Sequence, residues 1–95
     1  MKKILITGSS GFIGKNLVEN LLSEYEITGL SKKRKNNKLN HITKDITEIT
    51  SKDFKNTFCV IHLAAITDPK ICENFPDKCI TTNVLGTQKM LEAAR

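Results

Sequence analysis

Short apolar runs alternate along the chain with segments whose apolar positions recur every three or four residues. The run at residues 4–6 is rich in β-branched side chains and does not alternate with polar positions. Such a run is typical of a strand buried on both faces. Residues 58–63 form the second strong strand prediction, and 26–30 and 41–43 are predicted as further strands.

Two segments have the spacing of helices. One helix is predicted over residues 12–23, where the apolar positions are Phe12, Ile13, Leu17, Val18, Leu21 and Leu22. A second is predicted over 76–95, with Pro76 in its first turn and one face traced by Ile80, Val84, Thr87, Leu91 and Ala94. Residues 48–57 are consistent with a short helix or turn, and 67–69 with a turn. Buried strands that alternate with helices imply an α/β fold with a parallel sheet and right-handed crossovers.

Length and composition place the chain among ordinary globular proteins of at most one domain. It has 95 residues, of which 39% are hydrophobic and 26% charged. Its apolar runs are far shorter than the roughly 20 residues that cross a bilayer. No cationic stretch leads into an apolar run and a small-residue cleavage site, so no signal peptide is predicted. We therefore expect no membrane partner and a cytoplasmic protein.

The positive charge is concentrated in one segment. The formal net charge is +5, and residues 31–40 hold five basic and no acidic residues, so the other 85 residues sum to zero. Such a cluster is consistent with a solvated basic loop, and it can also attract a phosphate or a nucleic acid.

The three cysteines suggest neither a disulfide framework nor a zinc site. Their number is odd, they form no C-x-x-C motif, and the two histidines match no ligand spacing. Cys59 lies in an apolar run, where a small buried hydrophobe is expected. Cys72 and Cys79 are seven positions apart. We expect no metal site.

A glycine-rich turn joins the first strand to the first helix. Residues 7–14 read TGSSGFIG, with three glycines in a Gly-x-x-Gly-x-x-Gly spacing. Gly8 can turn sharply out of the strand, Gly11 can let a pyrophosphate approach the backbone, and Gly14 can let the helix pack closely on the sheet. The start of the helix then offers free N–H groups and a positive dipole end to phosphates. The context favours a dinucleotide site over a glycine turn that binds nothing.

The motifs resemble those of the extended short-chain dehydrogenase/reductase family, the NAD(P)-dependent epimerases and dehydratases of nucleotide sugars. Besides the glycine turn, the segment VIHLAA at residues 60–65 is similar to the family's fourth strand. The segment NVLGT at 83–87, followed by MLEAAR, is similar to its next helix. The resemblance covers residues 2–95. It implies a partial Rossmann-like sheet of about four strands, in the order 3-2-1-4, with helices on both faces.

The resemblance also implies a set of cofactor contacts. The glycine-turn residues Gly8, Ser10, Gly11, Phe12, Ile13 and Gly14 would hold the pyrophosphate. Asp45 and Ile46 match the family's Asp–aliphatic pair beside the adenine. Leu63, Ala64 and Ala65 would line the ribose on the nicotinamide side, and Asn83 matches an Asn near the active site, although a role in local helix packing stays open.

The end of the second strand bears on the choice between NADP and NAD. NAD-binding proteins usually place an acidic residue there to bind the ribose 2′-hydroxyl. Here the strand is followed by Ser31, Lys32, Lys33 and Arg34. Basic side chains can pair with a 2′-phosphate, so we predict NADP in preference to NAD.

Members of the family do their chemistry with a Tyr-x-x-x-Lys pair, in which the Tyr acts as acid and base. The chain has one tyrosine, Tyr25, and Gly29 stands four positions later. We therefore expect residues 1–95 to form a truncated NAD(P)-binding Rossmann domain without a substrate domain, catalytically inactive alone. An apolar fourth strand left at the sheet edge would favour self-association, by edge pairing or helix swapping.

Three functions follow from these observations. The first is the cofactor half of a nucleotide-sugar epimerase, dehydratase or reductase. The second is a dinucleotide-binding sensor or regulatory module without chemistry. Nucleic-acid binding through residues 31–40 is the third, and it is disfavoured because no aromatic residue is interleaved with the basic ones.

Overall fold

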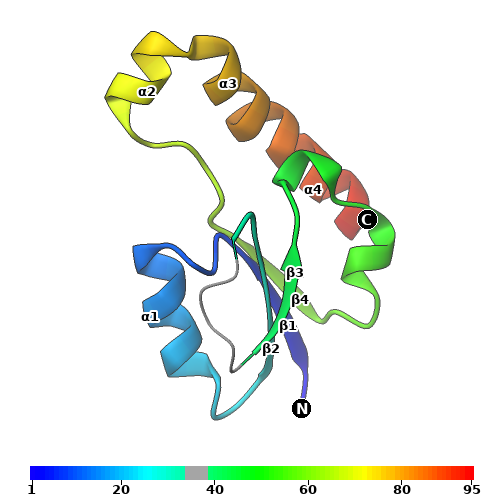
Figure 1. Cartoon of the computed structure of the whole chain (residues 1–95). Helices are drawn as coiled ribbons and strands as arrows, with labels where there is room; N and C mark the ends of the chain where they lie inside the picture. The colour runs from blue at the N-terminus through cyan, green and yellow to red at the C-terminus, as the bar shows by residue number, and fades with distance from the viewer. Residues whose placement is uncertain (34–38) are drawn as a thin grey trace.

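The computed structural model describes residues 1–33 and 39–95 and contains a four-stranded parallel sheet (Figure 1). The strands are β1 (Lys3–Thr7), β2 (Glu26–Ser31), β3 (Asn40–Thr43) and β4 (Cys59–His62). Their order is β3-β2-β1-β4, and each neighbouring pair is parallel. The predicted sheet order is therefore confirmed, with β1 and β2 inside the sheet.

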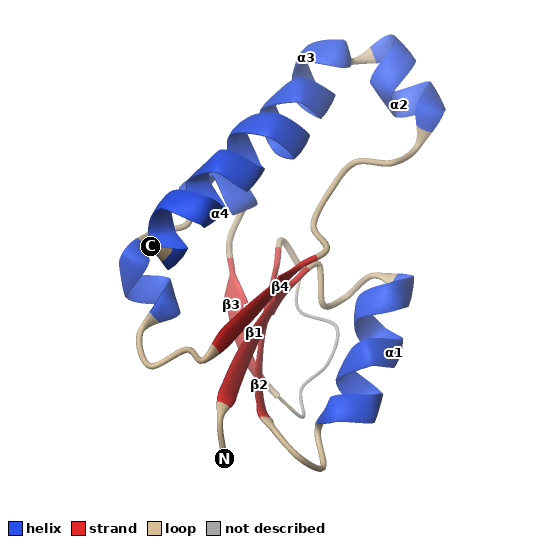
Figure 2. Cartoon of the chain, turned by 180° about the vertical axis from the view of Figure 1, so that it is seen from behind, coloured by secondary structure: helices blue, strands red, loops and turns tan. Residues whose placement is uncertain are grey.

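Helices cover both faces of this sheet, as predicted (Figure 2). One face carries α1 (Phe12–Leu21), and the other carries α4 (Gly86–Ala94) with the short 3-10 helices η1 (Ile46–Glu48) and η2 (Ser51–Phe54). The remaining helical segments are α2 (Pro69–Asn74), α3 (Pro76–Ile80) and the π-helical η3 (Thr81–Leu85), which leads directly into α4. In Figure 1, α2 and α3 extend beyond the carboxyl ends of the strands.

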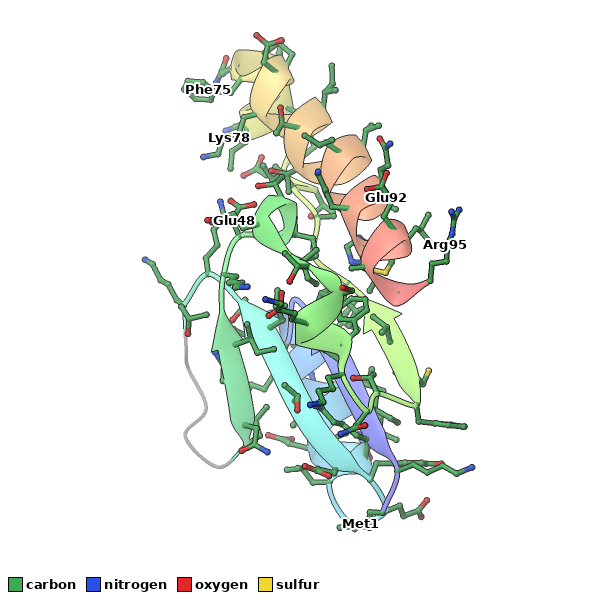
Figure 3. The ribbon with its side chains drawn as sticks, turned by 90° about the vertical axis from the view of Figure 1, so that its right-hand side faces the viewer. Met1, Glu48, Phe75, Lys78, Glu92 and Arg95 are labelled. Carbon is green, nitrogen blue, oxygen red and sulfur yellow. A yellow bond between two sulfur atoms is a disulfide. The ribbon has the colours of Figure 1, made fainter. Side chains whose placement is uncertain are left out.

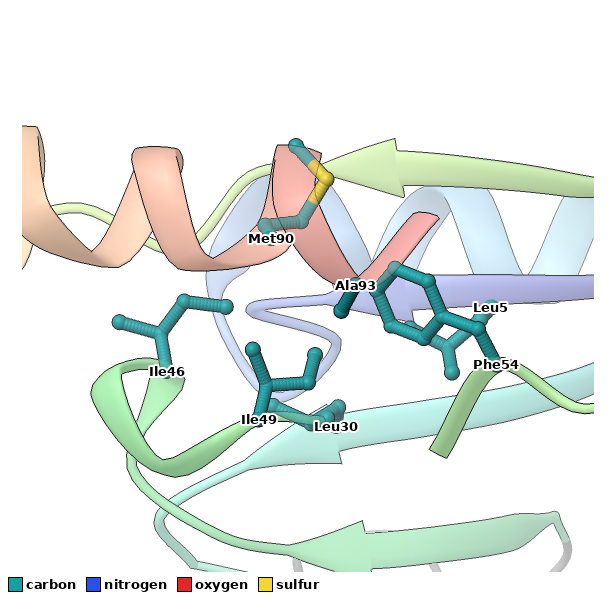
Figure 4. Packing of buried hydrophobic residues seen from close by; sticks show 7 residues of the cluster. All are labelled: Leu5, Leu30, Ile46, Ile49, Phe54, Met90 and Ala93. Atoms are coloured by element: carbon teal, nitrogen blue, oxygen red, sulfur yellow. The ribbon is translucent and has the colours of Figure 1, made fainter. Parts of the chain in front are cut away.

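Two apolar clusters form the core because side chains of β1 alternate between the faces. Leu5 packs with residues from the α4 side, whereas Ile4 and Ile6 pack toward α1. Figure 4 shows the first cluster, which consists of Leu5, Leu30, Ile46, Ile49, Phe54, Met90 and Ala93. The second consists of Ile4, Ile6, Val18, Ile27 and Leu39.

The helix α2 begins where a turn was predicted. The Asp68 side chain accepts a hydrogen bond from the Lys70 backbone N–H at 2.9 Å, and Pro69 occupies the first helical turn. An acidic N-cap followed by proline is a helix-start signal. The six-residue helix is too short for its apolar periodicity to reveal it.

The helix predicted over 76–95 is present, but the predicted apolar face is not the packed one. Ile80, Val84 and Leu91 are 60–62% exposed. The buried positions are instead Cys79, Gly86, Met90 and Ala93. The π-helical turn at η3 shifts the phase of the helix. Gly86 then packs so closely that a Cβ there would lie 2.5 Å from Cγ2 of Ile46.

The cysteine predictions are wrong in two respects. Cys59 is exposed, because it lies at the start of β4, which pairs with β1 alone within the described chain. Cys72 and Cys79 form a disulfide, with their Cα atoms 5.4 Å apart. The sequence gives only their separation, whereas pairing depends on how α2 folds back toward α3. Over residues 1–33 and 39–95, no helix is long and apolar enough to cross a membrane.

Candidate functional site

The glycine turn after β1 has a backbone that larger residues could not adopt. Gly8 has a φ of +72°, in the left-handed region, and a Cβ on it would lie 2.9 Å from the Ala64 backbone nitrogen. A Cβ on Gly14 would overlap the carbonyl oxygen of Gly8. These two glycines therefore hold the turn against β4 and α1 by close backbone approach.

The start of α1 is left open toward solvent. Gly11 is its N-cap, no side chain caps the helix, and its first turn contains no acidic residue. The first N–H groups of a helix have no partners inside it. A Cβ on Gly11 would meet one atom, the Gly8 carbonyl oxygen, at the ordinary distance of 3.4 Å. A phosphate can therefore approach these N–H groups, where the helix dipole also favours a negative charge.

A cleft of about 260 Å³ lies at the carboxyl ends of the strands. Ligands bind at this end of open α/β sheets. Roughly 300–1,000 Å³ is usual for pockets that enclose small molecules, so this cleft matches only part of a dinucleotide. The residues that line it are Gly8, Leu30, Ser31, Lys32, Lys44, Ile46, Ala64, Ala65, Ile66 and Thr82.

Hydroxyl groups connect the glycine turn to the end of β2. Ser10 Oγ lies 2.9 Å from Ser31 Oγ, and both hydroxyls are within hydrogen-bond distance of the Lys33 carbonyl oxygen. Ser31 Oγ also lies 2.7 Å from His41 Nε2 on β3. Three segments of the chain thus meet at Ser31, which positions the residues that follow β2 beside the glycine turn.

An ion pair links the basic segment to η1. Lys32 Nζ lies 3.1 Å from one carboxylate oxygen of Asp45, and the other oxygen accepts from the N–H and hydroxyl of Thr47 at 3.0 and 2.8 Å. The backbone hydrogen bond from Thr47 lowers the pKa of Asp45 below 3.8, and Lys32 lowers it further. Asp45 therefore caps η1 and stays ionised beside the cleft.

A chain of hydrogen bonds through Thr7 and His62 supports the cleft wall at Ala64. Thr7 Oγ1 accepts from the N–H groups of Leu63 and Ala64 at 3.0 and 3.2 Å. Both lone pairs are then used, so its hydroxyl donates to His62 Nδ1, 2.7 Å away.

This assignment fixes the tautomer of His62. With Nδ1 as acceptor, Nε2–H donates to Thr87 Oγ1 at 3.0 Å, and the Thr87 hydroxyl donates to the Asn83 carbonyl at 2.7 Å. Burial lowers the pKa of His62 below 6.5, which agrees with a neutral ring. Neutral His62 therefore connects the end of β4 to α4.

The Asn83 side chain holds the next part of the wall. Its Oδ1 accepts from the Ile66 N–H at 2.7 Å, and its Nδ2 donates to the Ile66 carbonyl at 2.9 Å. Both backbone polar groups of Ile66 are thus bonded by one amide. Asn83 thus joins η3 to the segment after β4, which is not the local helix packing that the sequence left open, and its cofactor role stays a prediction.

The chain matches a family model over residues 4–95, the NAD dependent epimerase/dehydratase family. The chain belongs to this family. The resemblance to extended short-chain dehydrogenase/reductases is therefore confirmed. The residues of the glycine turn fit a pyrophosphate on the observations above: an open helix start, and a backbone that only glycine permits at Gly8.

Named relatives agree with this membership. The GDP-6-deoxy-D-talose 4-dehydrogenase of Aggregatibacter actinomycetemcomitans is 35% identical over 94 residues, covering 96% of this chain and 30% of that protein. The structure of MoeE5 in complex with UDP-glucose and NAD superposes with a TM-score of 0.87 at 31% identity, covering 96% of this chain and 31% of that one. The UDP-glucose 4-epimerase of Thermotoga maritima gives a TM-score of 0.87 at 25% identity, covering 97% and 33%. The chain thus spans about a third of the length of these relatives.

The cleft is lined by some, but not all, of the residues predicted to contact the cofactor. Six predicted residues line the cleft: Gly8, Ser31, Lys32, Ile46, Ala64 and Ala65. Asp45 lies in an adjoining polar cleft with Lys32. Phe12 and Ile13 are 86% and 67% exposed in the first turn of α1, while Leu63 packs against the α1-side core. Arg34 lies outside the described residues. The contacts of all these residues with a dinucleotide stay predictions.

Several residues that position the site were not predicted from the sequence. Thr7 and His62 lie within quoted motifs of the epimerase/dehydratase family, but their hydrogen bonds join segments 55 residues apart. Ile66 and Thr82 line the cleft and each stands next to a predicted residue, Ala65 and Asn83. Adjacency to a predicted contact was the only available signal.

Proposed function

We propose that this chain binds an adenine dinucleotide across the glycine turn. The pyrophosphate would lie on the open N-terminus of α1, and the adenosine half would occupy the cleft beside β2. The observation that carries the proposal is the combination of Gly8, with φ +72°, and a first turn of α1 that no side chain caps. Family membership supports it independently.

The bound group would supply hydride transfer, and the residues of this chain would bind and orient it. Backbone N–H groups at the start of α1 would hold the phosphates. Ile46 would pack against the adenine, and Ala64 and Ala65 would give room for a ribose. The His62 chain would hold the backbone N–H groups of Leu63 and Ala64 through Thr7, which keeps this wall in place.

We further propose that NADP binds in preference to NAD. No acidic residue follows β2, and the Ser31 hydroxyl and Lys32 line the cleft. The Lys32 side chain is 59% exposed, and its ammonium group is already paired with Asp45. Asp45 therefore reduces the charge available to a 2′-phosphate, and Lys33 and Arg34 are the next two basic residues along the chain.

Calorimetric titration with NADP⁺ and NAD⁺ tests both steps. Replacing Lys32, Lys33 and Arg34 by Ser should weaken NADP⁺ binding by about tenfold or more, because charge-assisted hydrogen bonds are lost. NAD⁺ binding should change little. The matched control replaces Lys52, Lys70 and Lys89, three exposed lysines elsewhere, by Ser. Equal losses for both dinucleotides would refute the NADP preference, and no binding of either would refute the site.

At the level of the whole protein, we propose the dinucleotide-binding part of a nucleotide-sugar epimerase, dehydratase or reductase. The 95-residue chain alone should have no turnover, because its one tyrosine, Tyr25, packs against the α1-side core. The second candidate is a dinucleotide-binding sensor or regulatory module without chemistry, and the glycine turn with its uncapped helix start supports it as well. NADP-linked redox turnover by the purified 95-residue chain would contradict both the expected inactivity and the sensor without chemistry.

A partner can also be proposed for the open side of the sheet. Within the described chain β4 pairs only with β1, and Phe58 next to it is 62% exposed. An unpaired strand edge invites pairing with a second copy. Light scattering should show a mass that rises with concentration, and a constant monomer mass would argue against self-association.

A further inference from the structure

The segment that carries α2 has little to hold it in place. None of the residues of α2 is buried, and Phe75, which follows it, is 61% exposed. Figure 3 shows Phe75 and Lys78 at the end of the molecule opposite Met1. A six-residue helix is not stable by itself in water, because nucleation costs more than so few hydrogen bonds return. Tertiary contacts must therefore hold α2.

The Cys72–Cys79 disulfide is the strongest such contact. It joins the middle of α2 to α3, with Cα atoms 5.4 Å apart, which lies within the usual range. Cys79 is 7% exposed, whereas Cys72 is half-buried. Cys79 is thus anchored in the protein, and Cys72 is the less buried residue of the pair.

The disulfide is one of two attachments that bracket the segment. Before it, Asn83 holds both backbone groups of Ile66. Ile66 and Cys72 are therefore fastened to the same helical run, which extends through α3, η3 and α4. Ile66 lines the cleft, and Asp77 and Lys78 of α3 line the adjoining polar cleft with Lys32. Residues 67–75 are not among those that line either cleft; they connect Ile66 at the first cleft to α3 at the second.

We propose that Cys72 and Cys79 form a reversible thiol–disulfide site that attaches and releases α2. In the oxidised form α2 is held against α3. In the reduced form residues 67–75 lose their covalent attachment and α2 unfolds locally, while the Asn83 hydrogen bonds keep Ile66 in place. Without the disulfide, the Asn83 hydrogen bonds would remain to hold Ile66 to the helical run that lines the second cleft. This weaker attachment should reduce dinucleotide affinity severalfold, and this last step rests on the proposed function.

Small thiols and disulfides are the partners of this site. A thiolate attacks the Cys72 sulfur, a mixed disulfide forms, and Cys79 leaves as a thiolate that takes a proton. A second thiol of the reagent then attacks the mixed disulfide and releases Cys72 as a thiol. The protein gains two electrons and two protons, and two reagent thiols are oxidised to one disulfide. Oxidised glutathione reverses the exchange.

Counting reactive thiols is the first test. Without reductant, N-ethylmaleimide should label one cysteine, Cys59, which is free and exposed. After dithiothreitol it should label three, and graded mixtures of reduced and oxidised glutathione should move the chain reversibly between the two states. Three labels before reduction would overturn the proposal. So would a pair that glutathione leaves intact and only a denaturant exposes, because the bond would then be purely structural.

Limited trypsin digestion tests the release of α2. Cleavage after Lys70, in α2, should be about tenfold faster or more in the reduced chain, because the bond no longer restrains the open form. Cleavage after Lys89, in α4, is the internal control and should not change. Cys72→Ser in a Cys59→Ser background should cleave like the reduced chain while keeping buried Cys79. Equal cleavage in both redox states would overturn the proposal.

Titration with NADP⁺ in each redox state completes the experiment. We expect NADP⁺ to bind severalfold more weakly to the reduced chain than to the oxidised chain. Adding reductant to Cys72→Ser should not change its affinity for NADP⁺. This pair of results would support redox control of the cleft. Equal affinity in both states overturns that control but not the release of α2. Binding in neither state refutes the proposed function, while the labelling and trypsin results still decide the redox site.

Discussion

The two ends of the cleft are built in different ways. On the glycine side, Gly8 and Gly14 hold the turn by direct backbone contact, and deeply buried β1 residues support it. On the opposite side, residues 66–75 are mostly exposed and depend on the Asn83 amide and on the Cys72–Cys79 bond. The first side excludes larger residues at Gly8 and Gly14, because a Cβ at either position would come too close to backbone atoms. The second depends on a few polar or covalent bonds, each of which can be removed.

The largest expected effect comes from breaking the glycine side. In Gly14→Val the new side chain would overlap the Gly8 carbonyl oxygen, a backbone atom that cannot move aside. We expect a loss of roughly 3 kcal/mol or more in the free energy of unfolding, as for severe overpacking, measured by urea denaturation.

Gly11→Ala is the matched control on the same turn. Its methyl group would meet the Gly8 oxygen at 3.4 Å, an ordinary contact, so the cost should stay near that of a weakened N-cap, at most about 1 kcal/mol. A Gly14→Val chain as stable as the unchanged chain would show that the turn tolerates a different backbone. It would contradict the statement that close backbone contact holds the glycine side of the cleft.

An intermediate effect is expected from Asn83→Ala. The change removes two hydrogen bonds to Ile66 and leaves partly buried backbone groups unpaired, which should cost about 1–3 kcal/mol. Hydrogen exchange of the Ile66 amide should accelerate accordingly. Asn16→Ala is the control, because the Asn16 side chain donates to the Phe12 carbonyl on the solvent-exposed face of α1. If both variants exchanged alike, the amide would not be what holds this wall.

The smallest effect concerns the pH dependence of the His62 chain. Burial lowers the pKa of His62 in the folded state below 6.5, so the unfolded chain binds more protons between that folded value and 6.5. Stability should therefore be complete above pH 6.5 and decrease as the pH falls below it. Protonation at Nδ1 would also remove the acceptor of the Thr7 hydroxyl.

Urea denaturation at several pH values measures this slope. His62→Ala should be less stable at neutral pH and should show a shallower slope below pH 6.5. Because the two chains share every other titratable group, the difference between the two slopes belongs to His62. Identical slopes in the two chains would mean that His62 titrates alike when folded and unfolded.

Much of the fold could be predicted because its causes are local. The glycine spacing, the strand runs and the helix at 12–23 each follow from backbone sterics and from side-chain periodicity along one segment. The predicted apolar face of the last helix was wrong, because a π-helical turn interrupts the regular helical spacing. The π-helical η3 changes the phase of the last helix, so the residues predicted to trace its apolar face, such as Val84, are exposed and Gly86 packs inward.

In the candidate site, too, some features have local causes and others depend on how distant segments pack. Neighbours along the chain account for the glycine turn and for the basic residues after β2. The order of the strands was predicted from the family resemblance instead, because it depends on pairing between distant segments such as β1 and β4. Only the tertiary structure decided that Lys32 pairs with Asp45, that Thr7 and His62 share a hydrogen bond, and that Cys72 bonds to Cys79. Those contacts require side chains from separate segments to meet at bonding distance, and such distances exist only after the segments have packed.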